Sequence, residues 1–171
     1  MILYPLDANQ IFPLLHQGSA PPQGPILREM GFSMVVLCAN ESQPQASRFE
    51  GIEVLHAPND DNPMRDPTRD ELNRALEAAR QVARRIRDGK KVLVTCMAGL
   101  NRSGLVCGLT LHMLTGWAGS RCVQEVQAKR EAALCNESFV KVLTRIPAKA
   151  VNPQDKPSLQ LKLIVPGRYT S

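Results

Sequence analysis

Short apolar runs rich in β-branched residues are interspersed along this chain with longer segments whose apolar residues recur at helical spacing. The runs cover residues 32–38, 52–57 and 91–95, and they predict three strands. The last run has no polar alternation, which is typical of a strand whose sheet is covered by helices on both faces. The pattern predicts a single α/β domain with a central, mostly parallel twisted sheet flanked by helices.

Five segments are predicted to be helical, and the last three give the domain a helical C-terminal half. The clearest begins at Thr68, because Thr68 and Glu71 have the spacing of a capping box. Ser120 and Asn136 are further candidate N-caps, and residues 5–25 are predicted to be irregular. The predicted helices cover residues 26–30, 68–89, 103–115, 120–133 and 136–146.

We place the domain at residues 1–150 and expect an extended tail at 151–171, where proline and alternating leucines argue against a helix. The 171 residues are 43% hydrophobic and 22% charged, which is a globular composition. No apolar run approaches the roughly 18 residues of a membrane span, and the N-terminus lacks the pattern of a signal peptide. These features predict a cytoplasmic protein, which we expect to be a monomer that does not bind membranes.

The net charge indicates the kind of partner, and the cysteine spacing indicates whether disulfides or a metal site are expected. A net charge of +5 favours anionic partners. Many of the basic residues fall at 74–91, where the ordinary interpretation is the solvated face of a helix. The five cysteines have irregular spacing without zinc-binding pairs, so we expect reduced thiols, no disulfide framework and no metal.

Residues 92–106 read VLVTCMAGLNRSGLV and hold the most informative pattern in the chain. A strand that enters a short loop and then a helix forms an anion site, because the loop amides and the helix dipole attract negative charge. The same field stabilises a thiolate at Cys96, and Arg102 offers two parallel donors to a phosphate. We predict that Cys96 attacks phosphorus to form a cysteinyl-phosphate, and that Ser103 helps the thiolate to leave. The predicted phosphate-binding residues are Met97, Ala98, Gly99, Leu100, Asn101 and Arg102.

This stretch resembles the signature of the cysteine-dependent protein tyrosine phosphatases, in which Cys, five residues, Arg and then Ser or Thr follow a buried strand. Residues 8–147 are similar to the compact dual-specificity branch of that superfamily. QGSAP, LREMGFSMVVLCANE, FEGIEVLHAPNDDNP and CNESF resemble successive elements of that branch, in the correct order. The resemblance implies a phosphatase that acts on phosphotyrosine and on phosphoserine or phosphothreonine in proteins, without a cofactor.

The leaving group of such a reaction needs a proton, because an alkoxide or phenoxide leaves poorly at physiological pH. The turn-rich segment PNDDNPMRDP offers Asp60, Asp61 and Asp66. The family's spacing to the following helix implies that Asp61 is the general acid, with Asp60 as the alternative and Asp66 assigned to the helix start. Asn136 corresponds to the Asn that opens the family's last helix, and we expect it to support the phosphate-binding loop.

Two residues of the signature raise alternatives. Thr95 stands where the family usually has a His that orders the loop and stabilises the thiolate. A Thr hydroxyl offers one hydrogen bond and no charge, so we expect weaker activity or an optimum at higher pH, and a phosphate-binding pseudophosphatase is one alternative. Asn101 stands before the Arg as in relatives that act on RNA 5′-phosphates. Such a substrate is the second alternative, although no aromatic residues for base stacking cluster near the signature.

Cys38 ends the strand that is predicted to lie beside residues 91–95, so its side chain is expected to approach Cys96. The sequence LCAN resembles a region of certain lipid phosphatases of the superfamily in which a second Cys forms a reversible disulfide with the nucleophile. The resemblance implies that Cys38 protects Cys96 from overoxidation, and the alternative is a small buried hydrophobic residue. Absence of a Cys38–Cys96 disulfide after mild peroxide treatment would count against protection.

Overall fold

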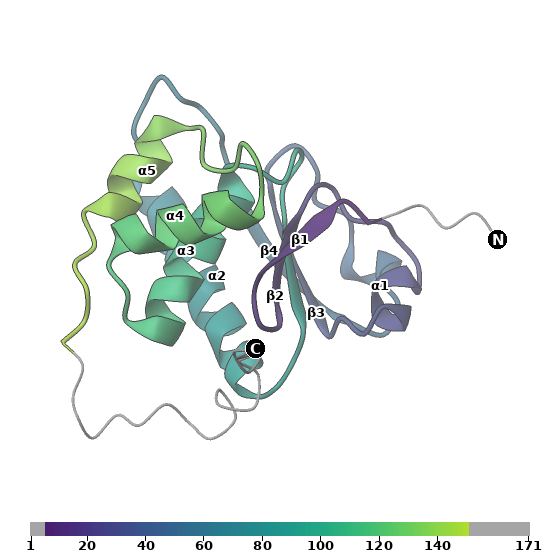
Figure 1. Cartoon of the computed structure of the whole chain (residues 1–171). Coiled ribbons are helices and arrows are strands. Elements are labelled where there is room, and N and C mark those ends of the chain that lie inside the picture. The colour runs from purple at the N-terminus through teal and green to yellow at the C-terminus, as the bar shows by residue number, and fades with distance from the viewer. Residues whose placement is uncertain (1–5, 151–171) are drawn as a thin grey trace, which may run out of the picture.

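Five strands form one sheet in the computed structural model, which describes residues 6–150 (Figure 1). They are β1 (Ala8–Phe12), β2 (Leu15–Gly18), β3 (Met34–Ala39), β4 (Glu53–Asn59) and β5 (Val92–Thr95). Their order is β1-β2-β5-β3-β4, and only β1 and β2 are antiparallel among the pairs within this sheet of described residues. The mostly parallel α/β fold predicted from the sequence is confirmed. The tail predicted at 151–171 lies outside the described residues.

Helices cover both faces of this sheet, as Figure 1 shows. One face packs against α2 (Arg69–Arg87), α3 (Arg102–Thr115), α4 (Gly119–Lys129) and α5 (Glu137–Thr144), and the other against α1 (Ile26–Glu29). In β3, Val36 and Cys38 belong to the main core under α2 and α3, whereas Val35 and Leu37 belong to a smaller core on the side of α1. Alternate residues of a strand point to opposite faces, so a strand buried on both faces has no polar positions.

The hairpin of β1 and β2 contains the two strands that the sequence pattern failed to predict among residues 6–150. These residues were expected to be irregular, because ANQIF and LHQG contain too few apolar residues to read as strands. The structure gives the reason. Gln17 and Gly18 are both buried although neither is apolar, since they lie against the loop that follows β5.

The helix ends agree with the predicted caps at two of three positions. At the start of α2, the Thr68 hydroxyl accepts from the Glu71 amide and the Glu71 carboxylate accepts from the Thr68 amide, so the capping box is confirmed. Asn136 caps α5 by accepting from the amide of Ser138. The predicted Ser120 cap is wrong, because α4 begins one residue earlier, at Gly119. A Cβ at position 119 would lie 1.7 Å from the Leu143 carbonyl oxygen.

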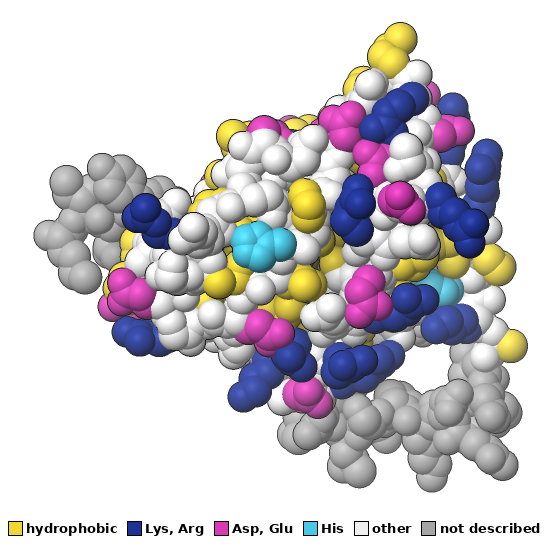
Figure 2. Space-filling view, turned by 180° about the vertical axis from the view of Figure 1, so that it is seen from behind, with side chains coloured by type: hydrophobic (Ala, Val, Ile, Leu, Met, Phe, Trp, Pro, Cys, Tyr) yellow, Lys and Arg dark blue, Asp and Glu magenta, His cyan; other side chains and the backbone are white. Residues whose placement is uncertain are grey.

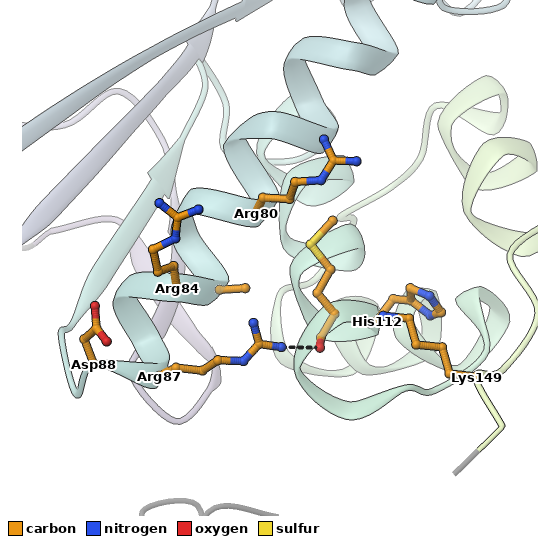
Figure 3. A pocket seen from close by; sticks show the side chains of 8 residues that line it. Arg80, Arg84, Arg87, Asp88, His112 and Lys149 are labelled. Atoms are coloured by element: carbon orange, nitrogen blue, oxygen red, sulfur yellow. Dashed lines mark hydrogen bonds between the residues drawn. The ribbon is translucent and has the colours of Figure 1, made fainter. Parts of the chain in front are cut away.

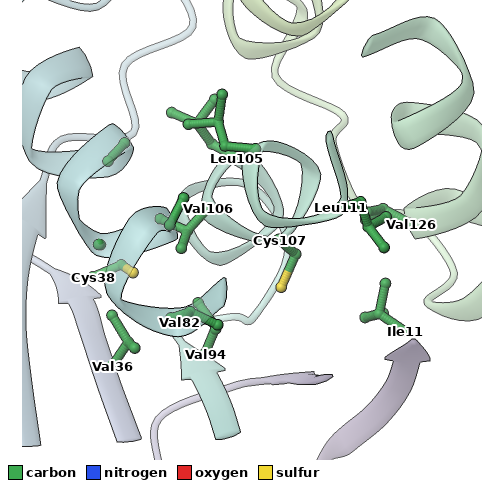
Figure 4. Packing of buried hydrophobic residues seen from close by; sticks show 14 of the residues in the cluster. Ile11, Val36, Cys38, Val82, Val94, Leu105, Val106, Cys107, Leu111 and Val126 are labelled. Carbon is green, nitrogen blue, oxygen red and sulfur yellow. The ribbon is translucent and has the colours of Figure 1, made fainter. Parts of the chain in front are cut away.

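The central helix α3 is buried from Arg102 to Leu111. Figure 4 shows Val106 and Cys107 of this helix packed among residues of β3, β5 and α2, which include Val36, Val94 and Val82. Burial raises the pKa of the Cys107 thiol, which is consistent with a core residue. Because α3 is fixed on all sides, its first turn, which carries Arg102, is held rigidly at one edge of the sheet.

Within residues 6–150, no helix combines the length and the apolar character that a membrane crossing needs.

His16 on β2 gives a pH-dependent stability. Burial, together with the nearby charge of Lys91, lowers the pKa of His16 to about 4, and its Nδ1 is buried without a hydrogen-bond partner. The unfolded chain still binds a proton at the ordinary pKa of 6.5. The stabilisation that comes from this difference in pKa is therefore fully present above pH 6.5 and is lost as the pH falls toward 4. The free energy of unfolding is expected to fall by about 2 kcal/mol between about pH 7 and pH 5. Urea unfolding at the two pH values measures this loss, and His16→Gln is expected to abolish most of it. An equal loss in the variant would assign the effect to other groups.

Candidate active site

The loop at residues 96–101 joins the carboxyl end of β5 to the first turn of α3. It packs closely on the neighbouring hairpin. Gly99 has a φ of +69°, and a Cβ at this position would lie 2.3 Å from the carbonyl carbon of Gly18. Only glycine satisfies both the backbone conformation and the close approach. The shape of the loop is thus fixed by contacts with β2.

The carbonyl groups of residues 97–100 all accept hydrogen bonds from the surrounding scaffold. Arg130, which follows α4, and Gln17 of β2 supply several of these donors from below the loop. The pairs are Met97 O with Ala20 N (3.2 Å), Ala98 O with Arg130 Nη2 (3.1 Å), Gly99 O with Arg130 Nε (2.6 Å) and with Gln17 Nε2 (2.9 Å), and Leu100 O with Leu134 N (3.1 Å). In a trans peptide unit the carbonyl and the following N–H point in opposite directions, so a carbonyl that faces the scaffold leaves the next amide facing away from it.

The backbone amides of residues 97–101 have no acceptor among the described residues. They lie on the concave side of the loop, at the N-terminus of the fourteen-residue helix α3. Successive unpaired amides of this kind form an anion-binding nest, and the helix dipole adds partial positive charge at the same place. The arrangement fits one tetrahedral oxyanion.

The Cys96 thiol lies at the base of this nest and is 3% exposed. Its Sγ is 3.2 Å from the Ser103 hydroxyl oxygen, so the hydroxyl can donate to a thiolate. Thr95, which was expected to support the loop, acts elsewhere. Its hydroxyl donates to the Val36 carbonyl at 2.7 Å and thereby links β5 to β3. The one hydrogen-bond donor of the Thr95 side chain is therefore used within the sheet.

The Arg102 guanidinium is held in a fixed orientation by residues after β3. Its Nη1 donates to both Asn40 Oδ1 (2.9 Å) and Glu41, and to the Asn59 carbonyl (3.2 Å), while Nη2 donates to Glu41 Oε1 at 2.7 Å. These hydrogen bonds lower the pKa of Glu41 to about 2, and the same pair raises the pKa of Arg102. Glu41 is thus a carboxylate at neutral pH.

One edge of the same guanidinium is left without a partner. Glu41 occupies the edge between Nη1 and Nη2, whereas Nε is buried and has no hydrogen-bond partner among the described residues. Each nitrogen of the free edge carries a hydrogen, so Nε and Nη2 together offer two parallel donors. A phosphate matches this geometry with two of its oxygens, and such an anion would satisfy the buried Nε.

Asp61 lies at the mouth of the loop between two side-chain amides. Asn101 Nδ2 donates to Asp61 Oδ2 at 3.0 Å, and Asn136 Nδ2 donates to Asp61 Oδ1 at 2.8 Å. Asn101 Oδ1 in turn accepts from the Asn136 backbone amide at 2.9 Å. The structure thus brings the predicted acid, the predicted loop residue and the predicted support residue into one network.

Asp60 is directed into a different cluster. Its carboxylate pairs with Arg65 at 3.1 Å, and Arg65 also binds both oxygens of Glu71 at 2.8 Å. The pKa of Glu71 is lowered to about 2, mainly by the hydrogen bonds from Arg65. The start of α2 is capped by Thr68, and Asp66 supplies only a carbonyl to this cluster. Of the three candidate acids, Asp61 alone contacts a residue of the phosphate-binding loop in the described structure.

Cys38 lies beneath the nucleophile candidate, as expected. The register pairs Leu37 with Thr95, so Cys38 and Cys96 are the next residues along neighbouring strands. Neighbouring strands are about 4.8 Å apart, which is within the Cα separation that a disulfide spans. Both are free thiols in this structure, and burial raises the pKa of Cys38 well above its ordinary value. Protection of Cys96 by Cys38 stays a prediction.

A small hollow opens beside Cys96 on the side of β3. Its volume is about 150 Å³, and Thr95, Cys96 and Met97 form one wall. The opposite walls come from residues 20–23 and 37–44. Met97 is 47% exposed at the rim. The loops that follow β2 and β3 therefore border the surface beside Cys96.

Three supporting residues were missed by sequence reasoning, namely Gln17, Glu41 and Arg130. Gln17 and Glu41 fall inside stretches that had been noted for their resemblance, but neither had a pattern that assigned it a role. Arg130 was assigned to a helix expected to reach residue 133. The helix ends at Lys129, because Arg130 takes extended φ/ψ values and reaches under the loop.

Comparisons with known proteins identify the family and the fold. The model of the dual specificity phosphatase catalytic domain matches residues 15–148. No curated protein gave a significant sequence match. Among solved structures, a mouse protein assigned as a dual specificity phosphatase and complexed with zinc tungstate has 27% identity and a TM-score of 0.71. That match covers 85% of this chain and 89% of the mouse chain.

Two further structures are similar over nearly their whole length. Human DUSP28 has 26% identity and a TM-score of 0.69, with coverage of 82% of this chain and 93% of its own. Tk-PTP in its active form has 30% identity and a TM-score of 0.65, with coverage of 84% and 99%. The fold is thus shared with phosphatases of known structure.

Proposed function

The chain belongs to the dual specificity phosphatase family, and from this premise we propose that it hydrolyses phosphate monoesters on proteins through a cysteinyl-phosphate intermediate. The substrates are phosphotyrosine and phosphoserine or phosphothreonine. One observation carries the proposal: a single stretch, residues 96–102, holds the Cys96 thiol, the unpaired amides of residues 97–101 and the buried, unpaired Nε of Arg102. The zinc tungstate complex of the mouse relative supports it, because tungstate is a tetrahedral oxyanion like phosphate.

In the first step the Cys96 thiolate attacks phosphorus, a sulfur–phosphorus bond forms and the ester oxygen–phosphorus bond breaks. The leaving oxygen takes a proton from Asp61. The amides of the loop and the free edge of Arg102 hold the three equatorial oxygens, whose charge is stabilised where it develops. Preorganisation is supplied by Arg130, Gln17 and Glu41, which fix the loop and the guanidinium before substrate arrives.

In the second step a water molecule attacks the cysteinyl-phosphate. Asp61, now a carboxylate, accepts a proton from that water, and the sulfur–phosphorus bond breaks to release inorganic phosphate. The departing thiolate accepts a hydrogen bond from the Ser103 hydroxyl, which lies 3.2 Å away. Because the Thr95 hydroxyl is used by Val36, Ser103 and the loop amides are the donors that stabilise the thiolate.

The experiment that tests this proposal follows hydrolysis of para-nitrophenyl phosphate in the presence of a metal chelator. A parallel reaction with ³²P-labelled substrate is quenched rapidly in alkaline denaturant. Turnover and a labelled, alkali-stable cysteinyl-phosphate are expected. A properly folded protein that binds vanadate but forms neither product nor labelled enzyme at any pH would instead support the pseudophosphatase suggested by Thr95.

Asp61→Asn is expected to lower kcat for para-nitrophenyl phosphate by about 100-fold, because the variant cannot give a proton to the leaving oxygen. Asp60→Asn is the matched control, since it removes a neighbouring carboxylate that pairs with Arg65 instead. The alkaline limb of the pH dependence of kcat/KM, where the general acid loses its proton, distinguishes the roles. Loss of that limb in Asp60→Asn rather than in Asp61→Asn would make Asp60 the acid.

The second candidate substrate, an RNA 5′-end, loses one of the two observations that favoured it, Asn101, and keeps the other, the basic helix at residues 74–91. Both ends of the Asn101 amide are occupied inside the protein, since Nδ2 donates to Asp61 and Oδ1 accepts from Asn136. Asn101 is therefore explained as a positioning residue for the acid. A triphosphate-ended oligonucleotide that is hydrolysed faster than a phosphotyrosine peptide would reverse this preference. The monomeric state and the cytoplasmic location stay predictions.

A further inference from the structure

A second cluster of basic side chains lies along the second half of α2. A hollow of about 610 Å³, here called the basic hollow, opens between the end of α2, α3 and Lys149. Figure 3 shows Arg80, Arg84 and Arg87 on α2, with His112 of α3 and Lys149 on the other side. In Figure 2, Lys and Arg side chains gather over the helical half of the face that is seen from behind. The remaining lining residues are Ala83, Asp88 and Met113.

The arginines of the basic hollow repel one another in the structure as it stands. Arg84 lies four residues after Arg80 and three before Arg87, so all three project from one face of α2. Like charges at these spacings destabilise a helix. Arg80 has a distant, exposed partner in Glu77 at 3.5 Å, and Arg87 donates to the Met113 carbonyl. Within residues 6–150, the side chains of Arg84 and Lys149 have no hydrogen bond or ion pair.

These features define the ligand as an extended anion. The guanidinium groups match carboxylate or phosphate oxygens with paired donors. The hollow has the volume of a ligand pocket rather than of a single phosphate site, so several anionic groups in a row fit it best. Ala83 and Met113 add an apolar floor, which suits the carbon atoms of a polypeptide.

Two other occupants fit less well. A nucleic acid strand would need aromatic platforms for its bases, and the only ring in the lining is His112, whose Nδ1 contacts the Trp117 carbonyl at 2.7 Å. The segment 151–171 of this chain contains three basic residues and one Asp, so its charge does not complement the hollow. We propose that the basic hollow binds an acidic segment of a partner protein, one with clustered carboxylate or phosphate groups.

The position of the hollow relates it to the catalytic loop. The acid-bearing segment precedes α2, and the basic hollow lies along the second half of this nineteen-residue helix, so the two are at most about 28 Å apart along the helix axis. An extended polypeptide covers that distance in about nine residues. A partner held at the hollow therefore has enough reach to present a second segment to Cys96. The binding itself does not depend on the proposed hydrolysis.

Fluorescence anisotropy with a labelled octaglutamate peptide tests the proposal, using the full chain with Cys96→Ser at about 50 mM salt, where screening is weak. Arg80→Gln together with Arg84→Gln is expected to weaken binding about tenfold. The matched control is Lys141→Gln with Arg145→Gln, which removes the same charge from exposed positions of α5 and its C-cap. The control is expected to change affinity by less than about twofold.

Three results would overturn the proposal: no octaglutamate binding, an equal loss in both double variants, or tighter binding of octauridylate that the Arg80/Arg84 variant abolishes. The last result would assign the hollow to RNA. Hydrolysis of para-nitrophenyl phosphate is measured separately with Cys96 intact and is expected to be unchanged in both double variants. Failure of binding and failure of the proposed hydrolysis are thus read from different assays.

Discussion

Cys96→Ser is expected to lower kcat for para-nitrophenyl phosphate by a factor on the order of 10⁴ or more, because the reaction then lacks its nucleophile. A serine hydroxyl is far less ionised than a thiol at neutral pH and attacks phosphorus poorly. The amides of residues 97–101 and the free edge of Arg102 stay in place, so vanadate binding is expected to persist. Steady-state kinetics and a vanadate titration of the same preparation measure the two properties.

Cys135→Ser is the matched control for this substitution. Cys135 is exposed, and its Sγ lies 3.4 Å from Asn101 Oδ1, a contact that a serine hydroxyl can keep. Activity close to that of the wild type is expected. Substantial turnover by Cys96→Ser, or its loss in Cys135→Ser instead, would contradict the assignment of the nucleophile.

Arg102→Lys is expected to lower kcat/KM by about 10³-fold, although it conserves the charge. The lysine ammonium is a point charge and cannot present the two parallel donors of the Nε–Nη2 edge. The ammonium also cannot donate hydrogen bonds to both carboxylate oxygens of Glu41 and to the substrate at the same time. The loss is expected mainly in kcat, because the equatorial oxygens carry most of their charge in the transition state.

Arg85→Lys provides the comparison for this change. Arg85 also binds both oxygens of a glutamate, with Nε to Glu53 at 2.7 Å and Nη2 at 2.9 Å, but this pair lies on the surface outside the site. Its replacement is expected to leave kcat/KM unaltered and stability within about 1 kcal/mol. An Arg102→Lys enzyme as active as Arg85→Lys would show that the paired donors are not needed.

The elements that could be predicted from the sequence were those whose signals are local. The buried strands β3 and β5, the Thr68 capping box and the Cys96–Arg102 spacing are each visible within a few residues. The parallel sheet follows from their order. Asp61 was assigned by spacing, and its contact with Asn101 explains why Asp61 and not Asp60 reaches the loop.

The parts that were missed depend on partners far away in the chain. Nothing near Arg130 indicates that it serves a loop thirty residues earlier, and the helical pattern around it predicted a longer α4. Glu41 binds a residue sixty-one positions later. The β1–β2 hairpin contains the polar residue Gln17 where it binds the loop. Because this polar residue is buried, the hairpin lacks the apolar pattern from which a strand is predicted.

The ion pair of Arg130 with Asp7 has a consequence for how the protein is made. These two residues lie 123 positions apart, and the Arg130 side chain that holds Asp7 and Asn9 also holds the carbonyls of the loop. Closing so long a loop is entropically costly and slow. During synthesis, Cys96 and Arg102 therefore leave the ribosome before Arg130, the residue that holds the loop between them in shape. Phosphate affinity should appear only after residue 130 is free to fold back onto the first strand.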